Sequence, residues 1–264
     1  MNTVLVTGAT DGIGRETARQ LLARGLRVLV HGRSQAKATR QAEALSSART
    51  VPVWGDLSDM RQVVALARQI IEQAAALDTV IHNAGVYEKR RRLTADGFEM
   101  TMAVNHFAPF LLTHHLLPAL RAARAGRVVT VSSMAHQNGS IDVDDLAFAT
   151  GYDAFQAYAN SKLANILFTR ALAKRLAGTT VTANALHPGV IGTKLLHAAF
   201  DIRGASVEEG ARTSVYLAVA DEVTGTSGKY FVDSREATPS REARDDALAT
   251  SLWVKSEQLL APFL

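Results

Sequence analysis

The chain has 264 residues, 47% of them hydrophobic, which is enough for one large or two small domains with a buried core. Its 29 basic and 25 acidic side chains leave a formal charge of +4, and apart from one basic run at 89–92 they are scattered, so no nucleic-acid partner is required. The lack of cysteine excludes disulfides, thiolate metal sites and a cysteine nucleophile, and the eight histidines form no His-Glu-x-x-His pattern, so we expect no metal.

No linker interrupts the chain, which favours a single domain over residues 1–264. The first strand is expected almost at Met1, which leaves no room for a signal or transit peptide. No stretch stays apolar for the roughly eighteen residues that a membrane-spanning helix needs. We therefore expect a cytoplasmic protein without stable membrane insertion.

The chain opens with a strand at 3–7, a glycine-rich turn and an amphipathic helix that runs to about Arg24. The turn reads Gly8-Ala9-Thr10-Asp11-Gly12-Ile13-Gly14. Glycines permit positive φ and close approach of a phosphate, and the free N–H groups at the helix start attract an anion. A structural turn would look similar, but this position after the first strand predicts dinucleotide binding.

A second strand at 26–30 ends in His31-Gly32-Arg33, where such folds recognise the adenosine ribose. An acidic residue here would bind the ribose hydroxyls of NAD, whereas a guanidinium pairs with a 2′-phosphate. The chain offers Arg33 and no acid, so NADP(H) is predicted, with NAD(H) as the alternative. Asp11 argues the other way, since its carboxylate could lie near that phosphate, although it also suits a helix start.

The next two strands end in further candidate binding residues. A helix at 34–47 and a strand at 50–54 lead to Gly55-Asp56-Leu57-Ser58, where Asp56 would either meet the adenine amino group or cap the next helix. A strand at 79–82 precedes Asn83-Ala84-Gly85, whose small side chains permit close approach to a cofactor or simply make a tight turn.

A helix at 97–124 contains Asn105 four residues before Pro109. Because proline has no N–H, the Asn105 carbonyl loses its partner within the helix. This carbonyl could hold a water, or the segment could be a simple proline kink. A strand at 127–132 then brings two hydroxyls, Ser132 and Ser133, to its carboxyl end.

The next long helix, which runs to about Leu176, carries Tyr158 and Lys162 four positions apart, so the two side chains share one face. A nearby ammonium favours the phenolate and lowers the pKa of the tyrosine, which makes it an acid/base group. An exposed, solvated pair is the alternative, and only residues elsewhere in the chain distinguish the two.

The last third begins with a strand at 180–186, followed by His187-Pro188-Gly189-Val190-Ile191-Gly192-Thr193. Apolar Leu195, Leu196 and Phe200 suggest a substrate lid over about 190–210, or plain packing. A helix at 207–220, a strand at 229–232 and a tail at about 236–264 complete the chain.

Strands that alternate with long helices predict an α/β fold: a single-domain, Rossmann-type doubly wound sheet, mostly parallel, of about seven strands. The glycine turn, Asn105, Ser133 and Tyr158 would then meet at the carboxyl edge of the sheet.

Taken together, these motifs resemble the short-chain dehydrogenase/reductase family, and within it most closely the retinol dehydrogenase and WW-domain oxidoreductase branch, without a WW domain. The match rests on the glycine turn, Asn83-Ala84-Gly85, Asn105, Ser132-Ser133, Tyr158-x-x-x-Lys162 and Pro188-Gly189-x-x-x-Thr193, and it spans nearly the whole chain.

The resemblance implies a role for each matching residue. Tyr158 would be the acid/base, Lys162 would lower its pKa and hold the nicotinamide ribose, Ser133 would bind the substrate oxygen, and Asn105 would anchor a relay water. The implied cofactor-binding residues are Gly8, Thr10, Gly12, Ile13, Gly14, Arg33, Asp56, Leu57, Asn83, Ala84, Gly85, Tyr158, Lys162, Pro188, Gly189, Ile191 and Thr193.

The implied activity is reversible hydride transfer between NADP(H) and a hydrophobic alcohol, aldehyde or ketone, in a homodimer or homotetramer that the tail could support or block. The rival hypothesis is an NADP(H)-binding redox sensor or scaffold without turnover. Three features depart from the family pattern: His82 stands where asparagine is usual, the long separation from Ser133 to Tyr158 keeps Ser132 as a rival serine, and Asp11 replaces the basic residue of many NADP-dependent members.

Overall fold

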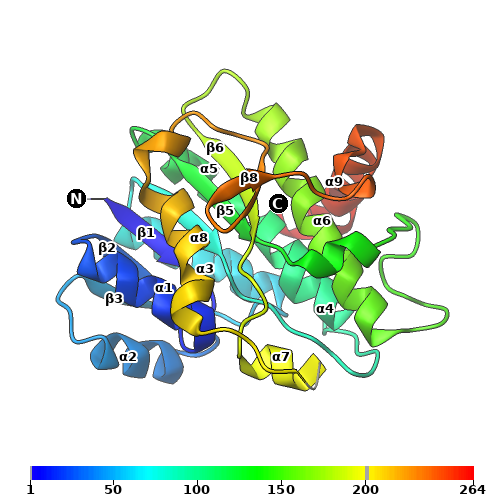
Figure 1. The fold of residues 1–264 in the computed structure, drawn as a ribbon, viewed down its shortest axis with the longest axis horizontal. Coiled ribbons are helices and arrows are strands. Elements are labelled where there is room, and N and C mark those ends of the chain that lie inside the picture. Colours follow the sequence, from blue (N-terminus) through cyan, green and yellow to red (C-terminus); the bar gives the residue numbers. More distant parts are fainter. Residues whose placement is uncertain (1, 200–201) are drawn as a thin grey trace.

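The computed structural model describes residues 2–199 and 202–264. Within them, one sheet of eight strands lies between two layers of helices (Figure 1), in the order β3-β2-β1-β4-β5-β6-β7-β8. Neighbouring strands pair in parallel up to β7. The parallel strands are β1 (Thr3–Val6), β2 (Arg27–Gly32), β3 (Thr50–Trp54), β4 (Thr79–His82), β5 (Arg127–Val131), β6 (Thr182–His187) and β7 (Tyr230–Val232).

The strand order reverses between β1 and β4, which are neighbours in the sheet although β2 and β3 separate them in the chain. This order confirms the predicted doubly wound, single-domain α/β fold. In such sheets ligands bind beyond the carboxyl ends of the strands, at the point of reversal.

Each central strand is buried on both faces, as its continuous apolar sequence predicts. Leu5 and Val80 pack on one face against α3 (Met60–Gln73), α5 (Ala108–Ala122) and α6 (Ala154–Arg175). Val6 and Ile81 pack on the other face against α1 (Gly12–Ala23) and α8 (Val207–Val219), while α2 (Gln35–Ala44) lies beside β2 and β3.

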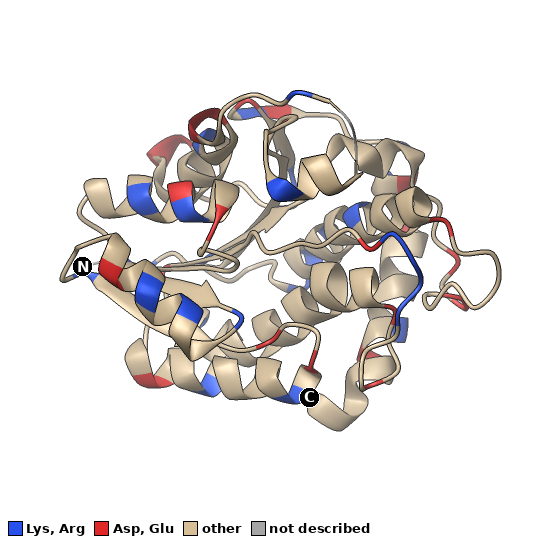
Figure 2. Cartoon of the chain, turned by 90° about the horizontal axis from the view of Figure 1, so that it is seen from below, with Lys and Arg blue, Asp and Glu red and all other residues tan. Residues whose placement is uncertain are grey.

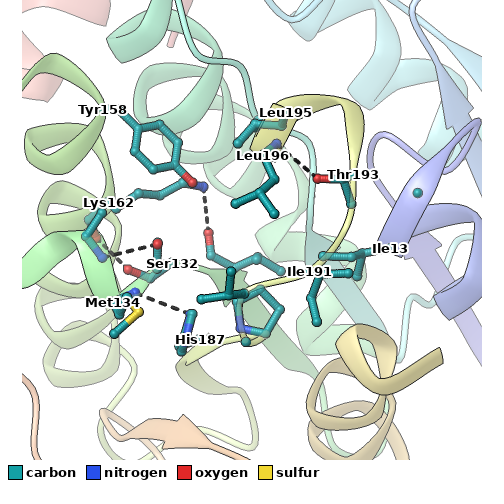
Figure 3. A pocket seen from close by; sticks show the side chains of 18 of the residues that line it. Ile13, Ser132, Met134, Tyr158, Lys162, His187, Ile191, Thr193, Leu195 and Leu196 are labelled. Atoms are coloured by element: carbon teal, nitrogen blue, oxygen red, sulfur yellow. Dashed lines mark hydrogen bonds between the residues drawn. The ribbon is translucent and has the colours of Figure 1, made fainter. Parts of the chain in front are cut away.

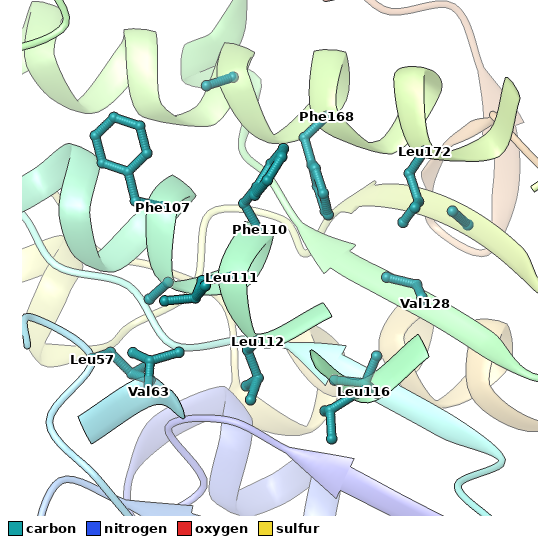
Figure 4. Close-up of a cluster of buried hydrophobic side chains, with 14 of the residues drawn as sticks. Leu57, Val63, Phe107, Phe110, Leu111, Leu112, Leu116, Val128, Phe168 and Leu172 are labelled. Atoms are coloured by element: carbon teal, nitrogen blue, oxygen red, sulfur yellow. The ribbon is translucent and has the colours of Figure 1, made fainter. Parts of the chain in front are cut away.

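The larger of the two cores lies between α5, α6 and the sheet (Figure 4). Leu111, Leu112 and Leu116 of α5 belong to this core, and Phe168 and Leu172 reach down into it from α6. All five side chains are buried. This packing fixes α6, and with it Tyr158 and Lys162, against the sheet.

The long helix predicted at 97–124 is divided into three parts. A short turn, α4 (Met100–Met102), leads into a π-helical segment, η1 (Ala103–Phe107), and then into α5. In η1 the Ala108 N–H bonds to the Ala103 carbonyl, five residues back. The segment therefore differs from a simple proline kink: a widened, π-helical turn directly precedes Pro109, the second residue of α5.

The sheet has one more strand than predicted, β8 (Arg235–Ala237), which pairs antiparallel with β7. The two strands are joined by Asp233 and Ser234, both with positive φ (48° and 59°). Two such residues make the tight hairpin turn that suits a twisted ribbon.

The tail after β8 forms η4 (Glu242–Arg244), α9 (Asp246–Leu260) and η5 (Ala261–Phe263). Helix α9 packs on α6, with Trp253 stacked on Phe168 at 5.9 Å and tilted against Phe110 of α5 at 4.6 Å. The remaining short elements are η2 (Met134–Asn138), α7 (Lys194–Ala199) and η3 (Asp221–Val223).

Charges of both signs are interspersed over the surface, with one longer basic stretch in a loop (Figure 2). That stretch is the run 89–92, which is exposed. None of the helices in the described part of the chain has the length and apolar character required to cross a bilayer.

Candidate active site

Two adjoining cavities lie along the carboxyl edge of the sheet. The first, of about 500 Å³, reaches from the glycine turn to Tyr158, and the second, of about 310 Å³, reaches from the same turn to Arg33. Ala84 and Gly85 line both. The pair has the extended shape that a dinucleotide needs, with small residues where the two halves meet.

Most of the residues predicted for the site line these cavities. The first is lined by Gly12, Ile13, Gly14, Asn83, Ala84, Gly85, Ser132, Ser133, Tyr158, Lys162, Pro188, Gly189, Ile191 and Thr193. The second is lined by Gly8, Thr10, Arg33, Asp56, Leu57, Ala84 and Gly85. Asn105 lines neither.

The glycine turn is held in place by a buried histidine that the sequence analysis missed. The Gly8 N–H donates to Nδ1 of His31 (3.1 Å), and Nε2 of the same ring lies 2.9 Å from the Gly55 carbonyl. Burial lowers the pKa of His31 to about 4, so the ring is neutral. Gly8 itself has φ +63° and its added Cβ would lie 2.9 Å from the Ala84 Cα, so two constraints require glycine here.

Asp11 lies on the first cavity, away from Arg33. Its carboxylate accepts from the Gly12 N–H as the N-cap of α1 and forms an ion pair with Lys194 at the start of α7. The Lys194 hydrogen bond holds the pKa of Asp11 below its usual value. Asp11 therefore argues less strongly against a 2′-phosphate than the sequence suggested, because its carboxylate is already paired with Lys194 at the first cavity.

Two cations line the second cavity at the end that lies beyond β2. Arg33 follows β2 and Lys37 lies in the first turn of α2. Asp56 also lines this cavity, and its Oδ1 accepts from the backbone N–H and the hydroxyl of Ser58 (2.9 and 2.8 Å). The cap of α3 is Asp59 rather than Asp56, since the helix begins only at Met60.

Tyr158 and Lys162 lie one turn apart on the buried face of α6 and point into the first cavity (Figure 3). The Lys162 Nζ is 5.5 Å from the centroid of the Tyr158 ring. Burial raises the pKa of Tyr158 to about 12, against a smaller lowering by a hydrogen bond with the Ser133 side chain. The expected lowering of this pKa by Lys162 is therefore not found: burial, which removes the phenolate from water, dominates.

Lys162 is itself almost fully buried. Its Nζ donates to the Val131 carbonyl at 3.1 Å, and burial lowers its pKa to about 8. The ammonium therefore stays charged near neutrality but releases its proton more easily than an exposed lysine.

The two serines at the end of β5 have different surroundings. The Ser132 hydroxyl is buried and donates to the Lys162 carbonyl at 2.7 Å, which ties β5 to α6. The Ser133 side chain hydrogen-bonds with Tyr158 and is partly exposed in the cavity. This geometry favours Ser133 as the serine that meets a substrate oxygen.

Asn105 supports the site from behind. Its side chain accepts from the Val86 N–H at 2.8 Å, donates to the Val86 carbonyl at 3.1 Å and donates to the Ser161 hydroxyl at 2.9 Å. A Cβ added to Gly85 would lie 3.4 Å from both Asn105 Oδ1 and Lys162 Nζ. Asn105 thus joins the loop after β4 to the helix that carries Tyr158.

The segment predicted to be a lid lines one side of the first cavity. Leu195 and Leu196 of α7 line it together with Ile202, whereas Phe200 lies outside the described residues. The base of this segment is held by two backbone hydrogen bonds: the Gly192 N–H donates to the Ala205 carbonyl at 2.9 Å, and the Ala205 N–H donates to the Val190 carbonyl at 2.8 Å. The pocket wall also contains His187, to which the sequence analysis assigned no role.

This fold and site define a nicotinamide-dependent oxidoreductase. The family model for short chain dehydrogenases matches residues 2–203, and the chain belongs to that family.

Its relatives are consistent with the predicted branch. Human retinol dehydrogenase 14 is 39% identical over 288 residues, which cover 98% of this chain and 86% of the relative. Retinol dehydrogenase 12 of Bos taurus is 41% identical over 270 residues, covering 97% and 85%.

Solved structures share the fold over nearly the full length. A Mycobacterium paratuberculosis protein has a TM-score of 0.85 and 35% identity, covering 99% of this chain and 94% of its own. The Pseudomonas aeruginosa RhlG/NADP active-site complex has a TM-score of 0.73 and 26% identity, covering 94% and 96%.

Proposed function

We propose that the protein is an NADP(H)-dependent oxidoreductase that interconverts a hydrophobic alcohol with its aldehyde or ketone. The main observation in support of this proposal is that Tyr158, Lys162 and Ser133 face one cavity, which adjoins a second cavity lined by Arg33 and Lys37. The bound nicotinamide would supply the hydride. The chain's own residues would bind, orient and move the proton.

Tyr158 is suited to protonate the substrate oxygen during reduction. Its raised pKa keeps the phenol protonated in the free protein, and Ser133 would hold the same oxygen within reach. Lys162 would place a positive charge next to the phenolate that remains after the proton leaves, and it would bind the ribose of the nicotinamide half. In oxidation the same groups act in reverse.

The preference for NADP(H) is supported by charge. Arg33 and Lys37 are both exposed cations on the second cavity, and guanidinium groups pair with phosphate in a bidentate geometry. Asp56, the acid in this cavity that follows β3, accepts hydrogen bonds from the N–H and the hydroxyl of Ser58. The solved P. aeruginosa relative is described as an NADP complex, which agrees with the proposal.

A hydrophobic substrate is supported by the outer wall of the first cavity. Met134, Phe155, Leu195, Leu196 and Ile202 line it, and Met134 and Ile202 are 49% and 50% exposed. Large apolar side chains at a cavity mouth lose contact with water when an apolar ligand covers them. The retinol dehydrogenases among the relatives are named for an apolar alcohol, which fits the same class.

The test is a panel of apolar aldehydes, ketones and alcohols of graded length, assayed with NADPH, NADH and their oxidised forms. We expect reduction of at least one apolar aldehyde or ketone with a clear preference for NADPH, and a loss of roughly 100-fold or more in kcat for Tyr158→Phe with cofactor affinity retained. Tight NADPH binding without turnover of any member would favour a cofactor-binding sensor instead. Near-wild-type turnover by Tyr158→Phe would refute the proposed chemistry.

A further inference from the structure

The peptide unit that follows Ser133 is held at both of its polar atoms by histidine rings. The Ser133 carbonyl lies 2.6 Å from Nδ1 of His136, and the Met134 N–H donates to Nδ1 of His187 at 3.2 Å. Figure 3 shows the Met134–His187 hydrogen bond on the cavity wall, close to Ser132. One peptide is therefore fixed from opposite sides immediately after the serine that faces Tyr158.

The hydrogen-bond partners determine the tautomer of each ring. A backbone N–H can only donate, so His187 must leave Nδ1 unprotonated. His136 accepts from the Ser240 N–H at Nε2 (3.1 Å), so its proton lies on Nδ1 and points at the Ser133 carbonyl. Both rings are neutral, with their protons on different nitrogens.

The surroundings keep them neutral. His136 is 1% exposed and packs on the Tyr230 ring at 5.1 Å, and His187 is 8% exposed. Burial and the neighbouring His136 lower the pKa of His187 to about 4, with Asp233 acting in the opposite direction. Burial also lowers the pKa of His136.

The segment before this peptide is fixed by other means. The Ser132 N–H donates to the Leu186 carbonyl at 2.7 Å, and the Ser132 hydroxyl donates to the Lys162 carbonyl. Ser133 is the second residue beyond β5, and its hydroxyl accepts from the Ala135 N–H at 3.2 Å as the N-cap of η2. Its direction therefore depends on the peptide that leads into η2. That peptide is the one the histidines hold.

We infer that His136 and His187 are positioning residues that orient the Ser133 hydroxyl toward Tyr158 and the substrate oxygen by fixing the Ser133–Met134 peptide. The inference rests on the proposed role of Ser133. It also connects the tail to the site, because Ser240, beyond β8, supplies the donor that sets the His136 tautomer. A displacement of about 1 Å at such a group can reduce turnover about 100-fold.

The first test compares two substitutions of His187. His187→Phe keeps the ring volume but offers no acceptor to Met134, whereas His187→Asn places a carbonyl oxygen near the position of Nδ1. We expect His187→Phe to lower kcat about 10-fold or more with little change in the Kd for NADPH, and His187→Asn to recover most of that loss. Equal losses in both variants would overturn the inference.

A double-mutant cycle shows whether His187 acts through Ser133. If it does, His187→Phe in a Ser133→Ala background should cost less than about twofold in kcat, because the group it positions is already absent. The same fold loss in both backgrounds would assign His187 a role independent of Ser133 and would refute the inference.

His106→Leu is a matched control. Its imidazole is also buried, with Nε2 2.9 Å from the Ser256 hydroxyl on α9. This variant should lower thermal stability while leaving kcat within about twofold. If the kcat loss in His187→Phe came only from lower stability of the fold, His106→Leu would show a similar loss. Tyr158→Phe in the same assay separates the two proposals: if it is inactive while His187→Phe is fully active, only the positioning role fails.

Discussion

Lys194 of the lid and Asp11 of the glycine turn form an ion pair across the mouth of the first cavity. The two residues are 183 positions apart in the chain, and one stands at the start of α7 and the other at the start of α1. Thr193, next to Lys194, lies close enough to the turn that a Cβ added to Gly12 would come within 3.4 Å of its methyl group. The lid therefore contacts the element that would hold the pyrophosphate.

Asp11→Asn should accelerate cofactor release. The pair is exposed, so its contribution is modest and screened by salt. We expect the dissociation rate of NADPH, measured by stopped-flow fluorescence at low salt, to rise about two- to fivefold and to match wild type at about 1 M salt. Asp144→Asn, which removes a distant ion pair with Lys255, should leave the NADPH dissociation rate unchanged at both salt concentrations. Slower release would mean that Asp11 acts mainly by repelling the phosphates.

Arg33→Ala should change the choice of cofactor. Loss of a charge-assisted hydrogen bond to a phosphate should raise the KM for NADPH about 10- to 100-fold, while the KM for NADH changes little. Arg40→Ala, an exposed cation on α2 that lines neither cavity, is the control. An equal rise for both cofactors would show that Arg33 supports the fold of the pocket and does not recognise a 2′-phosphate.

Gly8→Ala should damage both stability and cofactor binding. The left-handed φ and the contact with Ala84 together should cost about 2–4 kcal/mol of unfolding free energy, measured by urea denaturation. Gly25→Ala shares the left-handed φ (+84°), but its Cβ would meet nothing within 4 Å, so about 1 kcal/mol is expected. Similar losses in the two variants would mean that the Ala84 contact relaxes without cost.

Lys162→Met should change how stability depends on pH. Burial lowers the pKa of Lys162 from 10.5 to about 8, so between these values the folded protein binds fewer protons than the unfolded chain. The free energy of unfolding of the wild type should therefore rise, relative to Lys162→Met, by on the order of 3 kcal/mol as the pH increases from about 8 to 10.5. The raised pKa of Tyr158 affects both proteins above pH 10 and cancels in the difference. If the curves of unfolding free energy against pH were parallel for the two proteins, the pKa of Lys162 would not be lowered by burial.

The sequence predicted the parts of the fold that follow from local patterns. Continuous apolar runs located β3 at 50–54 and β4 at 79–82 with correct bounds, and the β–α alternation implied a doubly wound, mostly parallel sheet. The β7–β8 hairpin was missed because Asp233-Ser234 lacks the glycine that normally marks such a turn. The π-helical turn before Pro109 was missed because its bonds depend on packing rather than on a residue signature.

The site residues likewise fall into those that local sequence patterns reveal and those that depend on long-range contacts. Residues that follow strands, such as Ser133 and Arg33, could be placed at one edge because parallel strands all end there. His31 and His187 could not, since each acts through a hydrogen bond to a segment 23 or 53 positions away. The pKa of Tyr158 was expected to fall because the sequence shows its neighbouring cation but not its burial.

Trp253→Ala should show how much the tail contributes to the platform behind the site. The Trp253 ring stacks on Phe168 and is covered by the Arg175 guanidinium at 4.0 Å, so it joins α9 to the buried helix that carries Tyr158 and Lys162. Removing it should lower the unfolding free energy by about 2–4 kcal/mol, through lost burial and a cavity against Phe110 and Phe168. The neighbouring Val254 is 43% exposed, and Val254→Ala should cost less than about 0.5 kcal/mol. A comparable loss in both variants, measured by thermal or urea unfolding, would mean that α9 is held by its backbone and ion pairs rather than by this aromatic contact.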